Sequence, residues 1–264
     1  MAAQLAWGKQ RVGMEDQFWQ MEAEVAAYSG HFQQARDLWS HAKQAALRNG
    51  SQDRARWPEL DVASVEAEFQ MPIENGARRA MKTAGGADSK TVSALIMART
   101  GETRESAHLA EALAKENPSN TLVNYYWLPI IRASIALRLG QAHEALNLLA
   151  QAVPYELGAN GPLYPVYLRG QAYLALREGD LAAVEFQKLI DHRFLVLSDP
   201  SGALAHLWLG RAHALRAQQS NVKDAESFKA QARAAYEDFL RLWKYADPEI
   251  PILKQAKAEY AKLQ

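Results

Sequence analysis

The chain has 264 residues, and its 30 Lys and Arg residues balance 30 Asp and Glu residues, so the formal net charge is zero. This balance removes the simplest electrostatic case for a nucleic acid or an anionic membrane as partner, because binding to phosphates needs a surplus of cations on one face. Cysteine is absent, which excludes disulfides, thiolate metal sites and a cysteine nucleophile. Alanine and leucine far outnumber valine, isoleucine and threonine, and this bias predicts an all-α fold.

The N-terminal part of the chain contains a short helical segment and then a helical hairpin. Residues 1–12 have no partner helix in the pattern, and we interpret them as the remnant of a preceding helix in a longer protein. Over 15–48, Trp19 and Ala23 lie on the first helix, and Gly30 lies at the turn before a second apolar stretch. This pattern predicts two helices that pack closely against each other.

The rest of the chain contains a sequence repeat. Gly101, Gly140 and Gly179 lie 39 residues apart, and each follows an apolar helical stretch and precedes another. The repeating unit is therefore a helical hairpin with glycine at its turn. The sequence predicts one domain, 1–264, with six hairpins over 15–48, 57–84, 88–117, 121–153, 164–193 and 202–246. In the sixth hairpin an insertion, 218–229, replaces the short turn.

Residues 250–263 have the pattern of a capping helix. Its apolar residues recur at intervals of three or four: Leu253, Ala256, Tyr260 and Leu263. Its polar face is made up of Lys254, Lys257, Glu259 and Lys262. One polar face is what the exposed end of a helical stack requires, so we expect a right-handed α-solenoid of about six hairpins that ends in this helix.

The hairpins resemble tetratricopeptide repeats (TPR) in the spacing of their small residues. In the third hairpin Ala94, Gly101 and Ala110 stand at signature positions of that family, and Ala133 and Gly140 do so in the fourth. The resemblance implies closely packed helix pairs and a concave groove.

Two stretches, 163–193 and 234–264, are similar to a more particular group. They resemble the C-terminal TPR region of bacterial proteins that also carry a eukaryotic-type serine/threonine kinase domain or a winged-helix DNA-binding domain. That resemblance implies a sensory or partner-binding module and no activity for this chain. The insertion at 218–229 departs from the short turn of the family.

The sequence contains no catalytic motif that we recognise, and we expect neither an enzyme nor a cofactor. Asp191-His192-Arg193 has the residues of a kinase catalytic loop in the wrong order. The segment 85–91 resembles a phosphate-binding loop, but Ala84 and Ser89 occupy the two required glycine positions. We interpret this segment as a turn with Asp88 or Ser89 as the N-cap of the next helix.

The histidines do not predict a metal site. His206 and His213 lie seven residues apart, whereas a chelating pair on one helix is expected at a spacing of three or four. We therefore expect both to have packing roles.

A ladder of arginines is the candidate binding site. Arg99, Arg138 and Arg177 each precede a turn glycine by two residues, a position that we expect to face the concave groove. Four side chains on the same helices would extend this groove: Arg132, Arg169, Tyr173 and Arg211. The alternative is that each arginine only stabilises the C-terminal carbonyl groups of its own helix, which contributes about 0.3–1 kcal/mol.

These observations favour a non-enzymatic scaffold that binds a protein or a peptide, acidic in character, in the concave groove. We expect no nucleic acid bound and no membrane insertion by this chain, because no apolar run approaches the roughly 20 residues that cross a bilayer.

The alternative to a free-standing scaffold is the C-terminal sensory or regulatory region of a bacterial serine/threonine kinase or winged-helix regulator whose output domain is missing. A hydrolase or transferase with an unrecognised site is a third hypothesis. A free-standing chain would be cytoplasmic, whereas a region that follows a kinase and a membrane span would lie outside the inner membrane.

Overall fold

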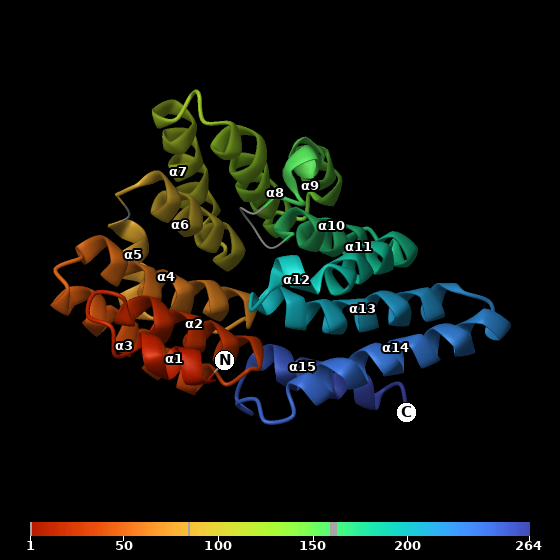
Figure 1. Ribbon diagram of the computed structural model, residues 1–264. Helices are drawn as coiled ribbons and strands as arrows, with labels where there is room; N and C mark the ends of the chain where they lie inside the picture. The colour runs from red at the N-terminus through yellow and green to blue at the C-terminus, as the bar shows by residue number, and fades with distance from the viewer. Residues whose placement is uncertain (1, 84, 159–162) are drawn as a thin grey trace.

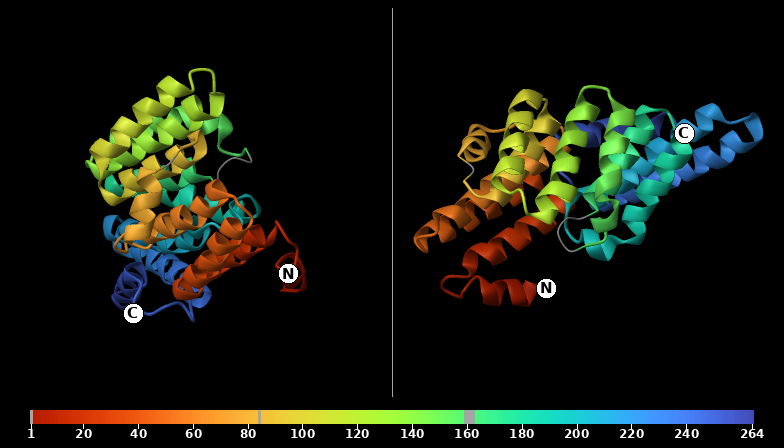
Figure 2. Two further views of the ribbon diagram at one scale, coloured as in Figure 1. Left: turned by 90° about the vertical axis from the view of Figure 1, so that its left-hand side faces the viewer. Right: turned by 90° about the horizontal axis from the view of Figure 1, so that it is seen from above.

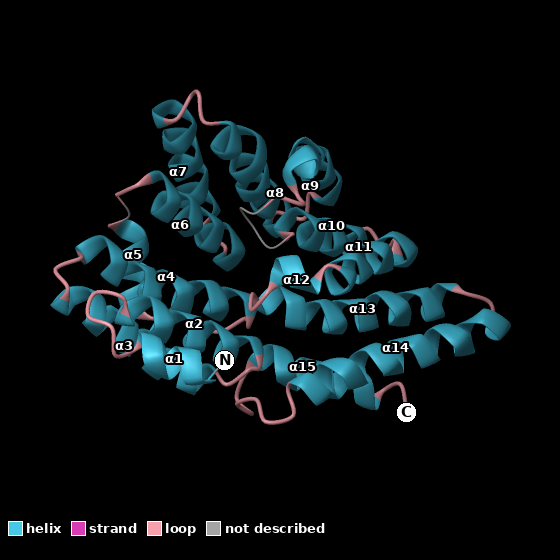
Figure 3. Ribbon diagram, in the orientation of Figure 1, coloured by secondary structure: helices cyan, strands magenta, loops and turns pink. Residues whose placement is uncertain are grey.

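The computed structural model describes residues 2–83, 85–158 and 163–264. Within these residues the chain forms α-helices joined by short turns, and none of them belongs to a β-strand (Figure 1, Figure 3). The prediction of an all-α fold is therefore confirmed for the part of the chain that the structure describes.

The helices follow one another around the molecule (Figure 1). The first seven are α1 (Ala2–Gly8), α2 (Glu15–Tyr28), α3 (Phe32–Arg48), α4 (Gln52–Glu68), α5 (Asn75–Lys82), α6 (Ala87–Thr100) and α7 (Thr103–Glu116). The next four are α8 (Leu128–Arg138), α9 (Ala142–Leu149), α10 (Tyr164–Ala175) and α11 (Gly179–Asp191). The last four are α12 (Arg193–Val196), α13 (Pro200–Gln219), α14 (Val222–Leu242) and α15 (Pro251–Ala261). A π-helical turn, Val123–Trp127, leads into α8, and a 3₁₀ segment, Ala150–Tyr155, follows α9.

Small buried residues allow neighbouring helices to approach closely. In the first hairpin Ala23 and Ala27 of α2 and Ala35 and Ala42 of α3 are completely buried. Alanine has no branched side chain to hold the two axes apart, and it is also the best helix former. The same residue type thus favours the helices and their packing.

Two helix starts differ from the sequence prediction, one of them because of a side-chain cap. Helix α4 begins at Gln52 and not near 57, because the Ser51 side chain accepts a hydrogen bond from the Arg54 backbone amide at 3.4 Å. Helix α6 begins at Ala87 with Gly86 as its N-cap, so the expectation that Asp88 or Ser89 is the cap was wrong. Ala84, the residue before this segment, lies outside the described residues.

The predicted insertion at 218–229 is not a loop. Helix α13 continues to Gln219 and α14 begins at Val222, so these residues lengthen both helices of the sixth hairpin. The Asn221 side chain caps α14 by accepting hydrogen bonds from the backbone amides of Lys223 and Asp224, both at 3.1 Å. The end of this hairpin therefore projects beyond its neighbours (Figure 2).

The 39-residue spacing fails in the fifth hairpin. Gly101 and Gly140 have φ values of +96° and +76° and form left-handed turns, but in the fifth hairpin the left-handed residue is Arg177, with φ +61°. Gly179 is instead the first residue of α11, where a Cβ atom would lie 2.9 Å from Arg216 Cγ and 3.1 Å from a backbone carbonyl oxygen. The glycine at 179 is thus required by close packing and not by the turn.

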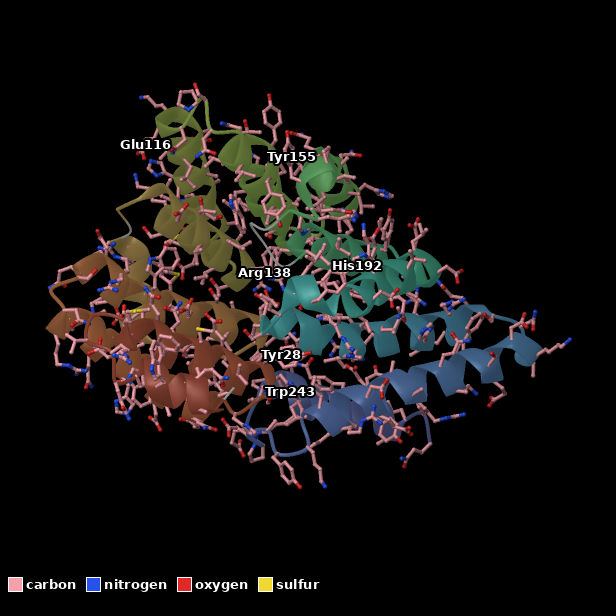
Figure 4. The ribbon with its side chains drawn as sticks, viewed as in Figure 1. Tyr28, Glu116, Arg138, Tyr155, His192 and Trp243 are labelled. Atoms are coloured by element: carbon pink, nitrogen blue, oxygen red, sulfur yellow. The ribbon has the colours of Figure 1, made fainter. Side chains whose placement is uncertain are left out.

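The turn of the first hairpin contacts the connection that follows α14. Trp243, which follows α14, donates a hydrogen bond from its indole Nε1 to the Tyr28 carbonyl oxygen at 2.9 Å (Figure 4). The Asp247 backbone amide donates to the Gly30 carbonyl oxygen at 3.0 Å, and its carboxylate accepts from the Gln33 backbone amide at 2.7 Å. One hydrophobic core contains residues of both hairpins, including Phe32 and Trp243. The first and last hairpins are therefore in contact, which the repeat pattern did not predict.

The terminal helices are also packed. Helix α1 lies against α2, where the rings of Trp7 and Phe18 are 6.4 Å apart, so the expectation that this segment has no partner helix was wrong. In α15, Leu253 and Ala256 are buried as the pattern predicts. Glu259 was expected on the polar outer face, but its carboxylate is bonded to other helices as described below.

Candidate functional site

A cavity of about 790 Å³ lies on the inner side of the arc of helices. Its walls come from α4, the α4–α5 connection, α5, α6, α8, α10 and α13, so no single hairpin forms it. The apolar residues of its wall include Met71, Pro72, Ile73, Leu137, Leu174 and Trp208. The polar residues include Glu68, Arg78, Arg99, Ser134, Arg138 and Gln171. A volume in the range of ligand sites, with an apolar wall and a few polar groups, is typical of binding pockets.

Arg99 forms a fork with Glu68 in the wall of this cavity. The Arg99 Nε and Nη2 atoms donate to the two carboxylate oxygens of Glu68 at 3.1 and 3.0 Å. The side chains are 17% and 10% exposed, so water screens this pair only weakly. Arg99 Nη1 also donates to the Gln171 Oε1 atom at 2.7 Å.

Two buried tyrosines complete the surroundings of Glu68. The Tyr164 hydroxyl donates to one Glu68 carboxylate oxygen at 2.5 Å, and the Tyr167 hydroxyl donates to the other at 2.9 Å. Burial, reinforced by the Glu68 carboxylate, raises the pKa of both tyrosines, so their hydroxyls stay protonated as donors. Burial opposes the charge of Arg99, but the Glu68 carboxylate outweighs this effect and raises the pKa of the guanidinium.

Two polar atoms in the cavity wall have no hydrogen-bond partner among the described residues. They are Ser134 Oγ and Gln171 Nε2, and both are buried from water. The orientation of the Gln171 amide is fixed, because its oxygen accepts from Arg99. An unpaired buried donor costs about 1–3 kcal/mol, so such atoms in a cavity wall call for an explanation.

Arg138 is an exposed cation of the cavity that forms no ion pair with the described residues. Its guanidinium lies against the α6–α7 turn, where a Cβ atom on Gly101 would be 3.0 Å from Nε and 3.2 Å from Nη2. None of the ion pairs among the described residues involves Arg138, whereas Arg78 is paired with Glu102 at 2.7 Å. Figure 4 shows Arg138 near the centre of the molecule, inside the arc.

The structure brings together only two members of the predicted arginine ladder. Arg99 and Arg138 line the cavity, but Arg177 occupies the left-handed turn position and its side chain is exposed outside the cavity wall. Arg132 is exposed on α8, and Tyr173 is half-buried on α10; neither lines the cavity. Two of the three arginines therefore line this cavity and Arg177 does not.

The two remaining candidate arginines hold helices together. Arg169 is buried and bonds Glu156 at 2.7 Å and Glu185 through a fork at 3.2 and 2.9 Å. Arg211 of α13 forms a fork with Glu259 of α15 at 2.8 and 2.9 Å, and its guanidinium lies 4.4 Å from the centre of the Trp208 ring. Neither side chain lines the cavity.

Four residues of the cavity were missed by the sequence analysis: Glu68, Ser134, Gln171 and Trp208. Glu68 lies two residues before Gln70, which has φ +60° and so takes the left-handed position that glycine takes in other turns. A search based on turn glycines cannot find it. Ser134 could have been predicted from the sequence, since it lies one helical turn before Arg138 on the same face of the helix.

A smaller cavity of about 170 Å³ adjoins the first. Both cavities have Ala67, Glu68 and Arg99 in their walls. The second is mainly apolar, with Leu95, Ile96 and Trp127 among its lining residues.

Within the described residues no group of three or more His, Asp or Glu side chains is arranged to hold a metal ion. His213 contacts Arg216 at 3.1 Å, and burial together with this cation lowers its pKa to about 4. Among the helices that the structure describes, none combines the length and the apolar character needed to cross a membrane.

No protein-family model matches the chain, and no curated protein is significantly similar to it. The resemblance to TPR regions therefore stays a prediction.

Proposed function

We propose that this chain is a non-enzymatic binding protein that holds a peptide segment of a partner protein in the cavity between α4, α6, α8 and α10. The observation that carries the proposal is the cavity itself, a space of about 790 Å³ that several hairpins build jointly. A packed helical protein normally fills its interior at high density, so a polar and apolar cavity of this size needs a reason.

The composition of the wall supports a peptide ligand. Met71, Ile73 and Leu174 offer apolar surface, and methionine adapts to different shapes. The wall carries three arginines and one glutamate, in a chain whose total charge is zero. This excess of positive charge favours an acidic ligand over a basic one.

The buried network around Glu68 supports a preformed site. Arg99, Tyr164 and Tyr167 all bond the same carboxylate, so the wall between α4, α6 and α10 is fixed before a ligand arrives. A preformed wall lowers the entropy lost on binding.

Selection of random peptides displayed on phage against the whole chain tests this proposal. Ala175 is exposed and lines the cavity, so Ala175→Trp fills the cavity without disturbing the core. The matched control is Ala230→Trp, because Ala230 is exposed on α14 and does not line the cavity.

Selected peptides are expected to lose at least about tenfold in affinity with Ala175→Trp and to keep their affinity with Ala230→Trp. Equal binding to the native chain and to Ala175→Trp would place the ligand elsewhere and overturn the proposal. Failure to enrich any peptide would also count against it.

A further inference from the structure

We infer that Ser134, Arg138 and Gln171 form a subsite for a single carboxylate group of the ligand. This inference rests on the proposed function, because it names the chemical group that the cavity recognises. The three residues are referred to below as the carboxylate subsite.

The first observation is the pair of unused donors. Ser134 is 2% exposed, and its hydroxyl has no hydrogen-bond partner among the described residues, although it lines the cavity. Gln171 also lines the cavity, and its Nε2 atom has no such partner either. Because Arg99 donates to the Gln171 oxygen, the amide cannot exchange its two ends without losing that bond. Both donor atoms are covered in the free protein, so small side-chain movements in the wall must present them to the ligand. A carboxylate suits them because it accepts hydrogen bonds only.

The second observation is the placement of Arg138. It lies four residues after Ser134 on α8, so both side chains leave the same face of the helix, about one turn apart. Its guanidinium rests against Gly101, where a Cβ atom would lie 3.0 Å from Nε. Arg138 thus contacts a neighbouring turn and pairs with no carboxylate of the described residues.

The third observation is the charge that remains in the cavity wall. Glu68 compensates Arg99, and Glu102 compensates Arg78, which leaves the charge of Arg138. One cation and two neutral donors match a group with one negative charge. A phosphate monoester carries nearly two negative charges at neutral pH and would be only partly neutralised.

The apolar side of the subsite indicates what the carboxylate is attached to. Leu137 precedes Arg138 on α8, and Leu174 follows Gln171 by one turn of α10; both line the cavity. The ligand group is therefore a carboxylate with an apolar chain or ring beside it.

The experiment uses the full-length chain labelled with ¹⁵N and three small probes. The probes are 4-phenylbutyrate, its neutral amide 4-phenylbutanamide, and 3-phenylpropyl phosphate, and each is titrated to millimolar concentration while amide shifts are followed by NMR. The variants are Ser134→Ala and Arg138→Gln. The matched control is Arg132→Gln, since Arg132 is exposed on the same helix but does not line the cavity.

We expect 4-phenylbutyrate to shift the signals around Ser134, Arg138 and Gln171 and to bind at least about tenfold more tightly than the amide. Arg138→Gln should abolish this preference, Ser134→Ala should reduce it, and Arg132→Gln should leave it unchanged.

Equal binding of acid and amide in the cavity would overturn the carboxylate subsite and leave the proposed function standing. Tighter binding of the phosphate would overturn the choice of carboxylate. Absence of any shift in the cavity with all three probes would also overturn the subsite, while the peptide selection decides the proposed function independently.

Discussion

Arg99 and Arg138 occupy equivalent positions, two residues before a left-handed glycine, yet their surroundings differ. The difference comes from the residue at the same position in the preceding hairpin. In the hairpin before Arg99 that residue is Glu68, which pairs with Arg99. In the hairpin before Arg138 it is Arg99, a second cation. In the following hairpin the position is held by Ala175. The sequence predicts that these arginines face the inside, but whether each is paired with a carboxylate depends on a neighbour that the turn glycines do not mark.

This difference predicts a large loss of stability for one single substitution and almost none for the other. Arg99→Gln should lower the free energy of unfolding by about 3 kcal/mol or more, because it leaves Glu68 buried without its cation. Arg138→Gln should change the free energy of unfolding by less than about 0.5 kcal/mol, because Arg138 is exposed. Urea unfolding of both variants measures this, and equal effects would contradict the assignment of Arg99 to structure and Arg138 to the ligand.

Glu66 gives a second prediction at this scale. It is 1% exposed, and burial raises its pKa to about 7, against the opposing effect of Arg36 and Arg78. The raised pKa means that Glu66 stabilises the fold below pH 4.5, and that this contribution is lost as the pH rises to about 7. In Glu66→Gln the side chain can still accept the hydrogen bond from the Glu74 amide, but it has no charge to bury.

The free energy of unfolding of Glu66→Gln, relative to the native chain, should therefore rise by a few kcal/mol between pH 4.5 and pH 8. Urea unfolding at several pH values measures this change. The control is Glu144→Gln, which removes an exposed charge from α9. A difference for Glu66→Gln that is independent of pH would show that folding does not raise the pKa of Glu66.

At the scale of the helix and its turn, the sequence pattern predicts most of the helices but not the residue at which each turn occurs. Apolar periodicity still matches when a helix boundary moves by a residue or two, whereas the position of a turn depends on a single residue. Arg177 takes a left-handed conformation that glycine would normally take, and a glycine two residues later suggested a regular spacing. Caps such as Ser51 and Asn221 extend helices beyond the apolar pattern, and for this reason the pattern alone indicates an insertion at 218–229 in place of longer helices.

Two substitutions at turn positions test which residues adopt the left-handed conformation. Arg177→Gly should raise the free energy of unfolding by about 0.5–1 kcal/mol, because the strain of a left-handed residue outweighs the entropy of glycine in the unfolded chain. Gly140→Ala should lower it by about 1–2 kcal/mol through strain alone, because a Cβ atom there meets nothing within 4 Å. Thermal unfolding measures both, and destabilisation by Arg177→Gly would contradict the turn assignment.

At the scale of the whole molecule, the closure of the chain was not predictable from the repeat. Each hairpin contacts its neighbours, and the path of a stack depends on the small rotation between successive units. That rotation accumulates, and a repeat pattern does not encode it. The residues that join the ends, Trp243 and Asp247, lie in the connection after α14, where no periodicity marks them. Gln255 of α15 also donates to Gln70 beside the cavity at 2.8 Å, so closure completes the surroundings of the proposed site.

The contacts of Trp243 and Asp247 with residues 28–33 hold the first and last hairpins together, and this closes the arc of helices that carries the cavity. Because the chain has no native cysteine, nitroxide labels can be placed at Gln34→Cys and Glu249→Cys, two exposed positions on either side of the contact between Gly30 and Asp247. An open stack of six hairpins at 8–10 Å per step would separate its ends by roughly 40–50 Å. Double electron–electron resonance should give one narrow distance well short of that separation. A broad distribution, or a distance near the open value, would contradict the closed arrangement.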